Sequence, residues 1–283
     1  MSQAEILKNL SYDDYVRLPG VRVSDLVKFR KSCLHARYDM LNPSGDTPST
    51  VIGTAVHACI LEPKKFLSDY AVAPKLDKRT TAGKAQWAQW QLDNAGSKIV
   101  LGFDDWNVVR AMTAAVIEHP AVLPIINLPS LRETVVTWSE PVRGEGTEPV
   151  SCKARIDWIV KLNETFVVDI KSCRDASANE FARSISRYRY HVQAASYLRA
   201  LQAAAPQTGT RRFLWVCVEN TAPYGVAVYE PGDGLLEQGA VEYQNFVQQF
   251  ALCSAINHWP GYPEMITPID LPKWDWSSDE VQS

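Results

Sequence analysis

The stretch that decides the fold runs from Val150 to Ser172 and reads VSCKARIDWIVKLNETFVVDIKS. Apolar and β-branched residues fill two segments on either side of a short polar turn, so this stretch predicts two adjacent β-strands. Each strand carries one aspartate among apolar neighbours, Asp157 in the first and Asp169 in the second, and Lys171 follows two residues later. Carboxylates held on neighbouring strands suit a hard divalent cation that activates water, so the stretch predicts a metal site.

A hairpin centred on Asn163 would bring the two aspartates face to face. In that register Asp157 opposes Asp169, with Cβ atoms roughly 4.5–5.5 Å apart. Like charges so close in an apolar sheet are costly unless a cation lies between them. Because strand side chains alternate, Asp169 and Lys171 share one face. The alternative makes Asp157 a turn residue and Asp169 the partner of Lys171 in a surface ion pair, which fits the apolar neighbours less well.

Composition indicates a globular protein without a membrane segment. The 283 residues carry a net charge of -3, and no apolar run approaches the ~20 residues of a membrane-spanning helix. Residues 1–10 lack a secretory pattern, and the six cysteines show no C-x-x-C spacing. These features favour free thiols in a cytoplasmic protein over a disulfide framework or a zinc or iron–sulfur site. The acidic charge argues against a generic DNA-coating protein, but not against an enzyme with a local basic channel.

The pattern of apolar residues predicts a single α/β domain over residues 1–283, with a mixed central β-sheet flanked by helices. Its parts are a helical N-terminal part at about 24–120, a sheet core at about 130–259 and a tail at 260–283. Predicted helices cover about 24–41, 54–61, 83–94, 103–119, 177–204 and 235–259, and the segment at 177–204 is either one helix or two helices with a break near Arg187. Predicted strands cover 131–139, 150–160, 166–172, 212–219 and 225–230.

Two polar motifs lie on predicted helices. His57 follows Gly53 by four residues, and its imidazole can ligate a cation, although a lone helical histidine is more often structural. Gln193 and Tyr197 are also four residues apart and therefore share one helix face. The plainer interpretation of that pair is a polar helix edge with one packed tyrosine.

Residues 74–84 form a predicted basic loop. Arg79 and Lys84 are its candidates for contacts with DNA phosphates, since arginine and lysine side chains supply many such contacts. The plainer alternative is a solvated loop without a ligand.

Four motifs follow one another along the chain: G-x-x-x-H at 53–57, R-I-D at 155–157, D-I-K at 169–171 and Q-x-x-x-Y at 193–197. In this order they resemble the PD-(D/E)XK nuclease superfamily and its RecB-like branch. Segments 53–66, 79–87 and 188–197 are similar to the RecE-type, exonuclease VIII-like phage nucleases. The resemblance covers roughly residues 24–259. One departure is Asp169, where many superfamily members have glutamate; aspartate still offers two oxygens.

The resemblance implies a PD-(D/E)XK nuclease core and an exodeoxyribonuclease. Such an enzyme digests linear double-stranded DNA from 5′ to 3′ and leaves 3′ single-stranded overhangs for homologous recombination by strand annealing. The implied partners are a single-strand annealing protein of the RecT or Bet type and further copies of the chain in a ring-shaped homo-oligomer, a trimer or tetramer. The implied setting is the cytoplasm of a bacterial host, with a phage or prophage gene.

The resemblance also implies roles for individual residues. Asp157 and Asp169 would bind Mg²⁺, with His57 as a third ligand whose nitrogen would also admit Mn²⁺. Lys171 would orient the nucleophilic water, lower its pKa or stabilise the transition state.

Further residues receive supporting roles. Gln193 and Tyr197 would hydrogen-bond the phosphate backbone or the lysine, and Glu62 would act through a bridging water or only cap its helix. Arg79 and Lys84 would hold the 5′-terminal phosphate or the duplex backbone.

Three other functions remain compatible with these motifs. The first is a RecB/Cas4-like end-processing nuclease or a structure-specific endonuclease of the same superfamily, although the cysteine cluster usual in Cas4-like proteins is missing. The second is a catalytically silent DNA-end-binding protein, which the intact Asp157, Asp169 and Lys171 argue against. The third is a structural subunit, which leaves His57 and Gln193 unexplained.

Overall fold

The computed structural model describes residues 4–43, 45, 47–94, 99–144, 148–161, 164–206 and 209–270. Asn163, the expected centre of the hairpin, lies outside the described residues, as does the tail from residue 271 onward.

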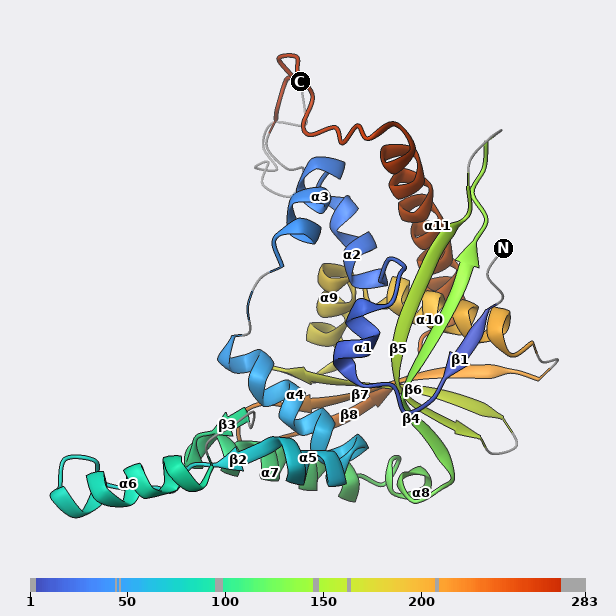
Figure 1. The fold of residues 1–283 in the computed structure, drawn as a ribbon. Coiled ribbons are helices and arrows are strands. Elements are labelled where there is room, and N and C mark those ends of the chain that lie inside the picture. Colours follow the sequence, from blue (N-terminus) through green and yellow to red (C-terminus); the bar gives the residue numbers. More distant parts are fainter. Residues whose placement is uncertain are drawn as a thin grey trace, which may run out of the picture.

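A six-stranded sheet forms the centre of the molecule, in the order β1-β4-β5-β6-β7-β8 (Figure 1). Strands β6 and β7 are parallel and all other neighbours are antiparallel, so the expected mixed α/β sheet is confirmed. The strands are β1 (Glu5–Leu7), β4 (Ser130–Glu140), β5 (Val150–Lys161), β6 (Thr165–Cys173), β7 (Arg211–Glu219) and β8 (Val226–Tyr229).

The hairpin of β5 and β6 has the expected register as far as the pair of Trp158 and Val168, but the expected pairing of Asp157 with Asp169 is not part of the ladder. Lys161 pairs with Thr165 and Trp158 pairs with Val168, which is the pairing of a hairpin centred on Asn163. Three short strands were not predicted, because each is only three residues long. They are β1 and the parallel pair β2 (Tyr70–Val72) and β3 (Ile99–Leu101).

The helices are α1 (Tyr12–Arg17), α2 (Val23–Leu26), the 3-10 helix η1 (Val27–Arg30), α3 (Cys33–Leu41), α4 (Pro48–Leu61), α5 (Pro63–Asp69), α6 (Thr81–Asp93), α7 (Phe103–Glu118), α8 (Leu123–Ile126), α9 (Ala178–Tyr188), α10 (Tyr190–Ala204) and α11 (Asp233–Ile256).

Two helix predictions need correction. The helix expected at 24–41 is broken, because Ser32 adopts an extended conformation and its side chain caps a new helix by accepting from the His35 amide. The helix expected at 54–61 begins six residues earlier at Pro48. Thr47 and Thr50 cap its first turn reciprocally, and proline is tolerated there because its missing N–H has no helical partner.

Helices cover both faces of the sheet (Figure 1). Helix α10 lies against β4, β5 and β7, and α11 packs on α10; this side buries Trp215, Phe181 and Tyr243. Helices α4 and α7 cover the opposite face, where Trp158 and Met112 are fully buried. Each apolar layer fixes one helix that carries site residues: α10 on one face and α4 on the other.

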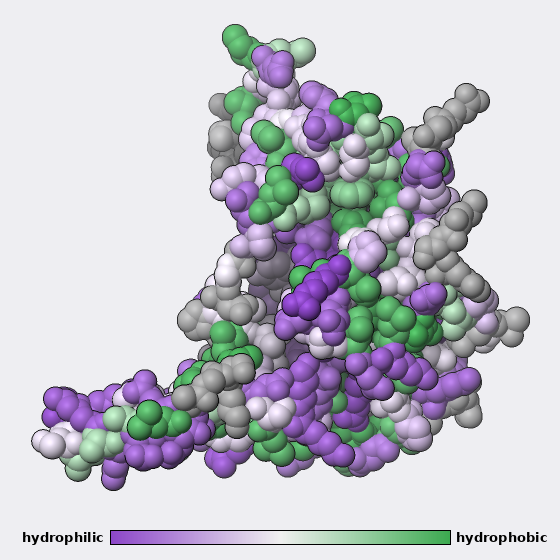
Figure 2. Space-filling model, in the orientation of Figure 1, coloured by the Kyte–Doolittle hydropathy of each residue, from purple (hydrophilic) through white to green (hydrophobic). Residues whose placement is uncertain are grey.

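Helix α6 is different from the other long helices. It projects from the body in Figure 1 and Figure 2, and within the described part of the chain it packs closely against no other helix or strand. A helix of this length is marginally stable alone in water, so the arm formed by residues 74–94 is a candidate for contact with a partner molecule.

Helices α10 and α11 are in close backbone contact at Gly239. A Cβ atom there would lie 2.3 Å from the carbonyl oxygen of His191 and 2.7 Å from its carbon. Since both atoms belong to the backbone of α10, any side chain at 239 must push the two helices apart.

We therefore expect Gly239→Ala to lower the free energy of unfolding by about 1–3 kcal/mol, the cost of overpacking a close contact. Gly234→Ala, on the same helix with no atom within 4 Å of the added Cβ, should be neutral or stabilising by about 0.5–1 kcal/mol. Urea denaturation measures both. Equal stabilities of the two variants would contradict the close contact.

Candidate active site

The central sheet divides at Asp157. The ladder between β5 and β6 ends at the pair of Trp158 and Val168. At the next position, Oδ2 of Asp157 accepts a hydrogen bond from the backbone N–H of Ile170 at 3.0 Å. A carboxylate thus takes the place of a backbone acceptor, and β5 continues paired with β4 (Figure 1). The division leaves the side chains of Asp157 and Asp169 at the point where the strands separate.

Glu133 interrupts the ladder on the other side of Asp157. The pairs before and after it in β4 form, but Glu133 itself does not pair with β5. Its φ is +48°, in the left-handed region that non-glycine residues rarely adopt. Such conformations gather at functional sites, where the surrounding structure holds them in place. The flanking pairs put Glu133 opposite Asp157, and the distortion lies at the point where the two carboxylates meet.

His57 reaches the site from α4, and Gly53 makes this approach close. A Cβ atom at Gly53 would lie 3.0 Å from Oγ of Ser172 in β6. One helical turn later, Nε2 of His57 lies 2.9 Å from the carbonyl oxygen of Ile170. The G-x-x-x-H motif therefore places one face of α4 directly against β6.

His57, Glu133 and Asp157 form the candidate metal site. One possible ligand atom from each lies within 4.8 Å of the others, and Nδ1 of His57 is 3.4 Å from Oδ2 of Asp157. A neutral imidazole that donates from Nε2 to Ile170 presents the Nδ1 lone pair to this carboxylate. Three possible ligand atoms that converge in this way fit a divalent cation such as Mg²⁺ or Mn²⁺.

The charge around Glu133 supports this interpretation. Burial and the neighbouring Asp157 carboxylate raise the pKa of Glu133 to about 8, although the guanidinium of Arg155, 2.9 Å away, acts in the opposite direction. Without a cation, the second negative charge is therefore unfavourable. A bound divalent ion would relieve this repulsion.

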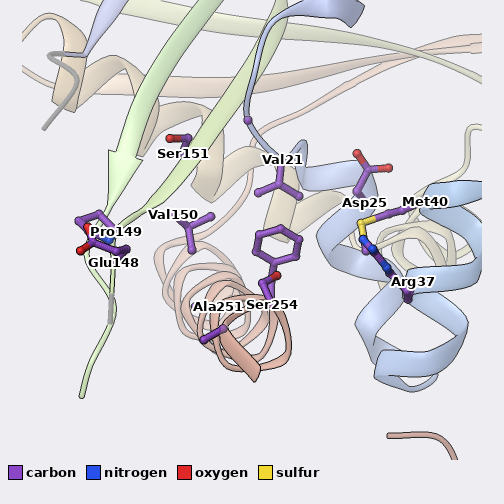
Figure 3. A pocket seen from close by; sticks show the side chains of 13 residues that line it. Val21, Asp25, Arg37, Met40, Glu148, Pro149, Val150, Ser151, Ala251 and Ser254 are labelled. Carbon is purple, nitrogen blue, oxygen red and sulfur yellow. The ribbon is translucent and has the colours of Figure 1, made fainter. Parts of the chain in front are cut away.

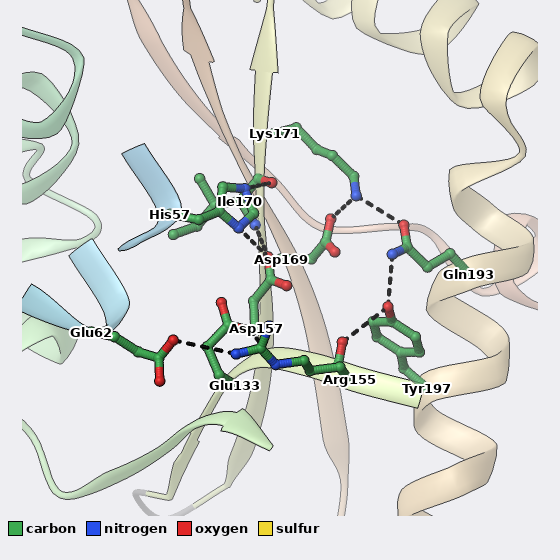
Figure 4. A network of polar contacts seen from close by, with 10 residues as sticks. All are labelled: His57, Glu62, Glu133, Arg155, Asp157, Asp169, Ile170, Lys171, Gln193 and Tyr197. Carbon is green, nitrogen blue, oxygen red and sulfur yellow. Dashed lines mark hydrogen bonds and ion pairs between the residues drawn. The ribbon is translucent and has the colours of Figure 1, made fainter. Parts of the chain in front are cut away.

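A second chain of contacts starts at Asp169 (Figure 4). Oδ2 of Asp169 lies 2.6 Å from the Lys171 ammonium, which also donates to Oε1 of Gln193 at 2.9 Å. Nε2 of Gln193 donates to the Tyr197 hydroxyl at 2.9 Å, and this hydroxyl lies 3.3 Å from the carbonyl oxygen of Arg155. The α10 motif thus holds the lysine in place from the opposite face of the sheet.

The buried ion pair keeps the lysine charged. Burial alone would lower the pKa of Lys171, but the Asp169 and Asp157 carboxylates more than offset it and the pKa is raised. Burial raises the pKa of Asp169 to about 6, against the opposing effect of Lys171. Lys171 is therefore a cation at neutral pH, suited to stabilising negative charge and not to accepting a proton.

Arg155 connects the outer carboxylates. Its guanidinium lies 2.9 Å from Glu133 and 3.3 Å from Glu62, the residue that ends α4. Glu62 therefore contacts the site through Arg155 and also pairs with Lys65 at 3.4 Å.

The structure brings together most of the residues that the sequence singled out: His57, Glu62, Asp157, Asp169, Lys171, Gln193 and Tyr197. Sequence reasoning missed Glu133 and gave no role to Arg155. The pairing of β4 with β5 could have been predicted in the same way as that of β5 with β6. Its register puts Glu133 opposite Asp157 and would have identified Glu133 as a candidate ligand. The three-residue group contains Glu133 in the position where Asp169 was expected.

Arg79 and Lys84 lie elsewhere, on the arm. Arg79 is 92% exposed at its side chain and pairs with Asp77 at 3.0 Å. Lys84 is exposed on the first turn of α6. On the same arm the Lys78 ammonium lies 3.2 Å from the Trp87 ring centroid, and Trp87 stacks on Trp90. The arm is basic and aromatic, but it does not touch the carboxylate site.

One cavity of the molecule lies away from the carboxylate site. It measures about 640 Å³ and lies between α2, α3, the start of β5 and α11 (Figure 3). Val21, Met40, Val150 and Phe250 are among its lining residues, and none of the site carboxylates lines it. A smaller cavity of about 280 Å³ borders Lys171, Gln193 and Tyr197.

Comparison with solved structures supports the fold. A crystal structure of a "putative exonuclease" from Eubacterium rectale aligns with a TM-score of 0.52 and 11% identity, over 93% of this chain and 96% of the other. At this identity the likeness concerns the fold alone. The structure of SSO0001 aligns over 75% of this chain and 96% of the other at 13% identity, with a TM-score of 0.31 that is too low to support an argument.

Sequence comparison gives the family. No curated protein matches the chain. The family described as a PDDEXK-like domain of unknown function, DUF3799, matches residues 22–272, which include every residue of the candidate site. The chain therefore belongs to the DUF3799 family of PDDEXK-like domains.

Proposed function

We propose that this protein is a metal-dependent exodeoxyribonuclease of the RecE type. It digests linear double-stranded DNA from 5′ to 3′ and leaves 3′ single-stranded overhangs for homologous recombination by strand annealing. The observation that carries the proposal is the pairing of two groups at the division of the sheet. The donors of His57, Glu133 and Asp157 converge on one side, and the charged Lys171 is held by Asp169 and Gln193 on the other.

In the proposed hydrolysis of the phosphodiester, some site residues bind the cation and Lys171 stabilises negative charge. His57, Glu133 and Asp157 would hold the cation, and Asp169, whose Oδ2 pairs with Lys171, would be a further ligand through its other carboxylate oxygen. When bound, the cation lowers the pKa of water and neutralises charge on the scissile phosphate. Lys171 donates to the nucleophilic water or to a phosphate oxygen, where its charge stabilises the transition state.

The supporting residues keep these groups in position. Gln193 and Tyr197 fix the Lys171 ammonium through two successive hydrogen bonds. Arg155 separates Glu133 from Glu62 and limits their mutual repulsion. Glu62 therefore acts through Arg155 in this proposal and not as a direct ligand.

The proposed biological setting follows from the resemblance to RecE-type nucleases. A ring-shaped trimer or tetramer would enclose the duplex, and enclosure is compatible with a net charge of -3 because global attraction is then unnecessary. A RecT- or Bet-like annealing protein would take over the overhang in the cytoplasm of a bacterium that carries the phage or prophage. No helix in the described ranges is long and apolar enough to span a bilayer.

Metal binding is testable without DNA. We expect millimolar Mn²⁺ or Mg²⁺ to raise the melting temperature by several degrees, since a ligand at about 100 times its Kd adds about 2.7 kcal/mol to stability. Asp157→Asn and Glu133→Gln should lose most of this rise, whereas Glu237→Gln, an exposed glutamate on α11, should retain it. If Glu133→Gln keeps the metal-induced rise in melting temperature and Asp169→Asn loses it, the ligands are His57, Asp157 and Asp169, as the sequence predicts, and Glu133 is not among them.

Nuclease activity is measured on linear duplex labelled at either end, with one 5′ terminus blocked. The wild type with Mg²⁺ should release nucleotides from the free 5′ end and leave a 3′ overhang, and it should spare closed circular duplex.

Lys171→Ala should lower the rate roughly 100- to 1000-fold, the usual cost of losing an electrostatic stabiliser. Lys161→Ala, an exposed lysine at the end of β5, is the matched control. Cleavage of circles would favour the endonuclease alternative, and no cleavage would favour a silent DNA-end-binding protein.

The arm is the proposed contact with the duplex backbone. Arg79→Ala combined with Lys84→Ala should weaken DNA binding and reduce the slope of log affinity against log salt by about 2, because two phosphate contacts are lost. The metal-induced rise in melting temperature should not change. Lys161→Ala again serves as control, and an unchanged salt slope would remove the arm from the DNA path.

A further inference from the structure

A ladder of aromatic rings runs from the core to the surface beside Lys171. Tyr229 stacks on Phe181 at 5.3 Å, Phe181 on Tyr190 at 6.0 Å and Tyr190 on Tyr188 at 5.5 Å between ring centroids. Phe181 is buried, whereas Tyr188, the outermost ring, is 55% exposed. Among the described residues, Tyr190 is the one aromatic ring stacked on Tyr188. The ladder therefore ends in an exposed aromatic ring.

The backbone changes direction between Tyr188 and Tyr190, the last two rings of the ladder. Arg189, between α9 and α10, has φ +58° and ψ +39°, a left-handed conformation. This reversal lets residues 188 and 190 stack on each other instead of following one continuous helix. Left-handed non-glycine residues persist where the surroundings over-determine them, often at ligand sites.

The ladder borders both the catalytic lysine and a cavity. The Lys171 ammonium lies 4.6 Å from the Tyr190 ring centroid. Tyr188, Tyr190, Tyr197 and Lys171 all line the cavity of about 280 Å³. Its volume is near the lower end of the range for small-molecule sites, which suits one nucleoside and not a longer segment.

The two arginines that line the cavity are already paired with carboxylates of the protein. Arg22 forms a two-pronged pair with Asp25 at 2.8 and 3.1 Å, and Arg189 pairs with Glu242 at 3.1 Å.

The two lysines of the cavity are also occupied. Lys153 donates to the carbonyl oxygens of Tyr15, Val16 and Leu18, and Lys171 is held by Asp169. No cation that lines the cavity lacks a partner among the described residues. The cavity therefore offers aromatic surface more than free positive charge, which suits a neutral base better than a second phosphate.

We propose that this cavity is a nucleobase subsite, in which the base of a nucleotide next to the scissile phosphate stacks on Tyr188. The inference rests on the proposed nuclease function and adds to it a requirement on the substrate. A base can enter only after it leaves its partner strand, so the terminal pairs of the duplex must open before cleavage. Base-on-aromatic stacking tolerates any sequence because every base has a π face.

The test uses linear duplex with 2-aminopurine at the first, second or third nucleotide from the 5′ end, first bound without Mg²⁺. The fluorescence at one of these positions should be quenched by stacking on wild-type protein. Tyr188→Ala should abolish that quench and weaken end binding about 5- to 100-fold. Tyr188→Phe, which keeps the ring, should retain both. Tyr38→Ala, which removes a similarly exposed tyrosine on α3, should leave both unchanged.

A second measurement needs only the wild type. An abasic residue replaces the same three nucleotides in turn, and Mg²⁺ is added. Nucleotide release should slow at the position whose base fills the cavity, and a terminal mismatch should speed the first cleavage. Wild-type release that is indifferent to abasic residues, with an unchanged quench in Tyr188→Ala, overturns the subsite alone. A wild type that releases no nucleotides with Mg²⁺ overturns the nuclease function and the subsite together.

Discussion

The site depends on one hydrogen bond, from the backbone N–H of Ile170 to the carboxylate of Asp157. In an unbroken sheet a backbone carbonyl of β5 would accept it. Because a side chain accepts instead, β5 separates from β6 without leaving a buried N–H unpaired, which would cost about 1–3 kcal/mol. The carbonyl of the same residue accepts from His57. Site side chains thus satisfy both the N–H and the carbonyl of Ile170. The same two hydrogen bonds allow β5 to separate from β6 and hold Asp157 and His57 in position.

The helices on the two faces of the sheet bring different side chains to the place where β5 and β6 separate. Helix α4 brings His57 to Asp157 and Glu133, while α10 brings Gln193 to Lys171. Each helix is held by an apolar layer, so the relative position of the two groups is set by the whole core and not by a loop. This arrangement suits a reaction in which a cation and an ammonium must contact the same phosphate from two directions.

The sequence predicts the parts of the structure that depend on local pattern. The strands of the sheet core, the hairpin register and the i,i+4 pair of Gln193 and Tyr197 follow from alternation and helix periodicity. The break at Ser32 rests on a local cap, which the periodicity of apolar residues does not reveal. The left-handed conformation of Glu133 does not follow from local pattern, because it depends on contacts with segments distant along the chain. Arg79 and Lys84 show the same limit: their charge is evident in the sequence, but their position on a projecting arm is not.

The lengths of the side chains of Asp169 and Glu133 fit the partners that each carboxylate contacts. Asp169, which stands where many PD-(D/E)XK proteins have glutamate, has a short side chain, and its carboxylate contacts the lysine two residues later on the same face of β6. The longer carboxylate beside Asp157 comes instead from Glu133 on β4, where the left-handed backbone turns it toward His57. A shorter acid in β6 and a longer acid in β4 therefore leave two carboxylates near the imidazole and a third that keeps Lys171 charged. The left-handed backbone at Glu133 is a local departure from a regular β4 at this point, and such departures gather at functional sites, where the surrounding structure holds them in place.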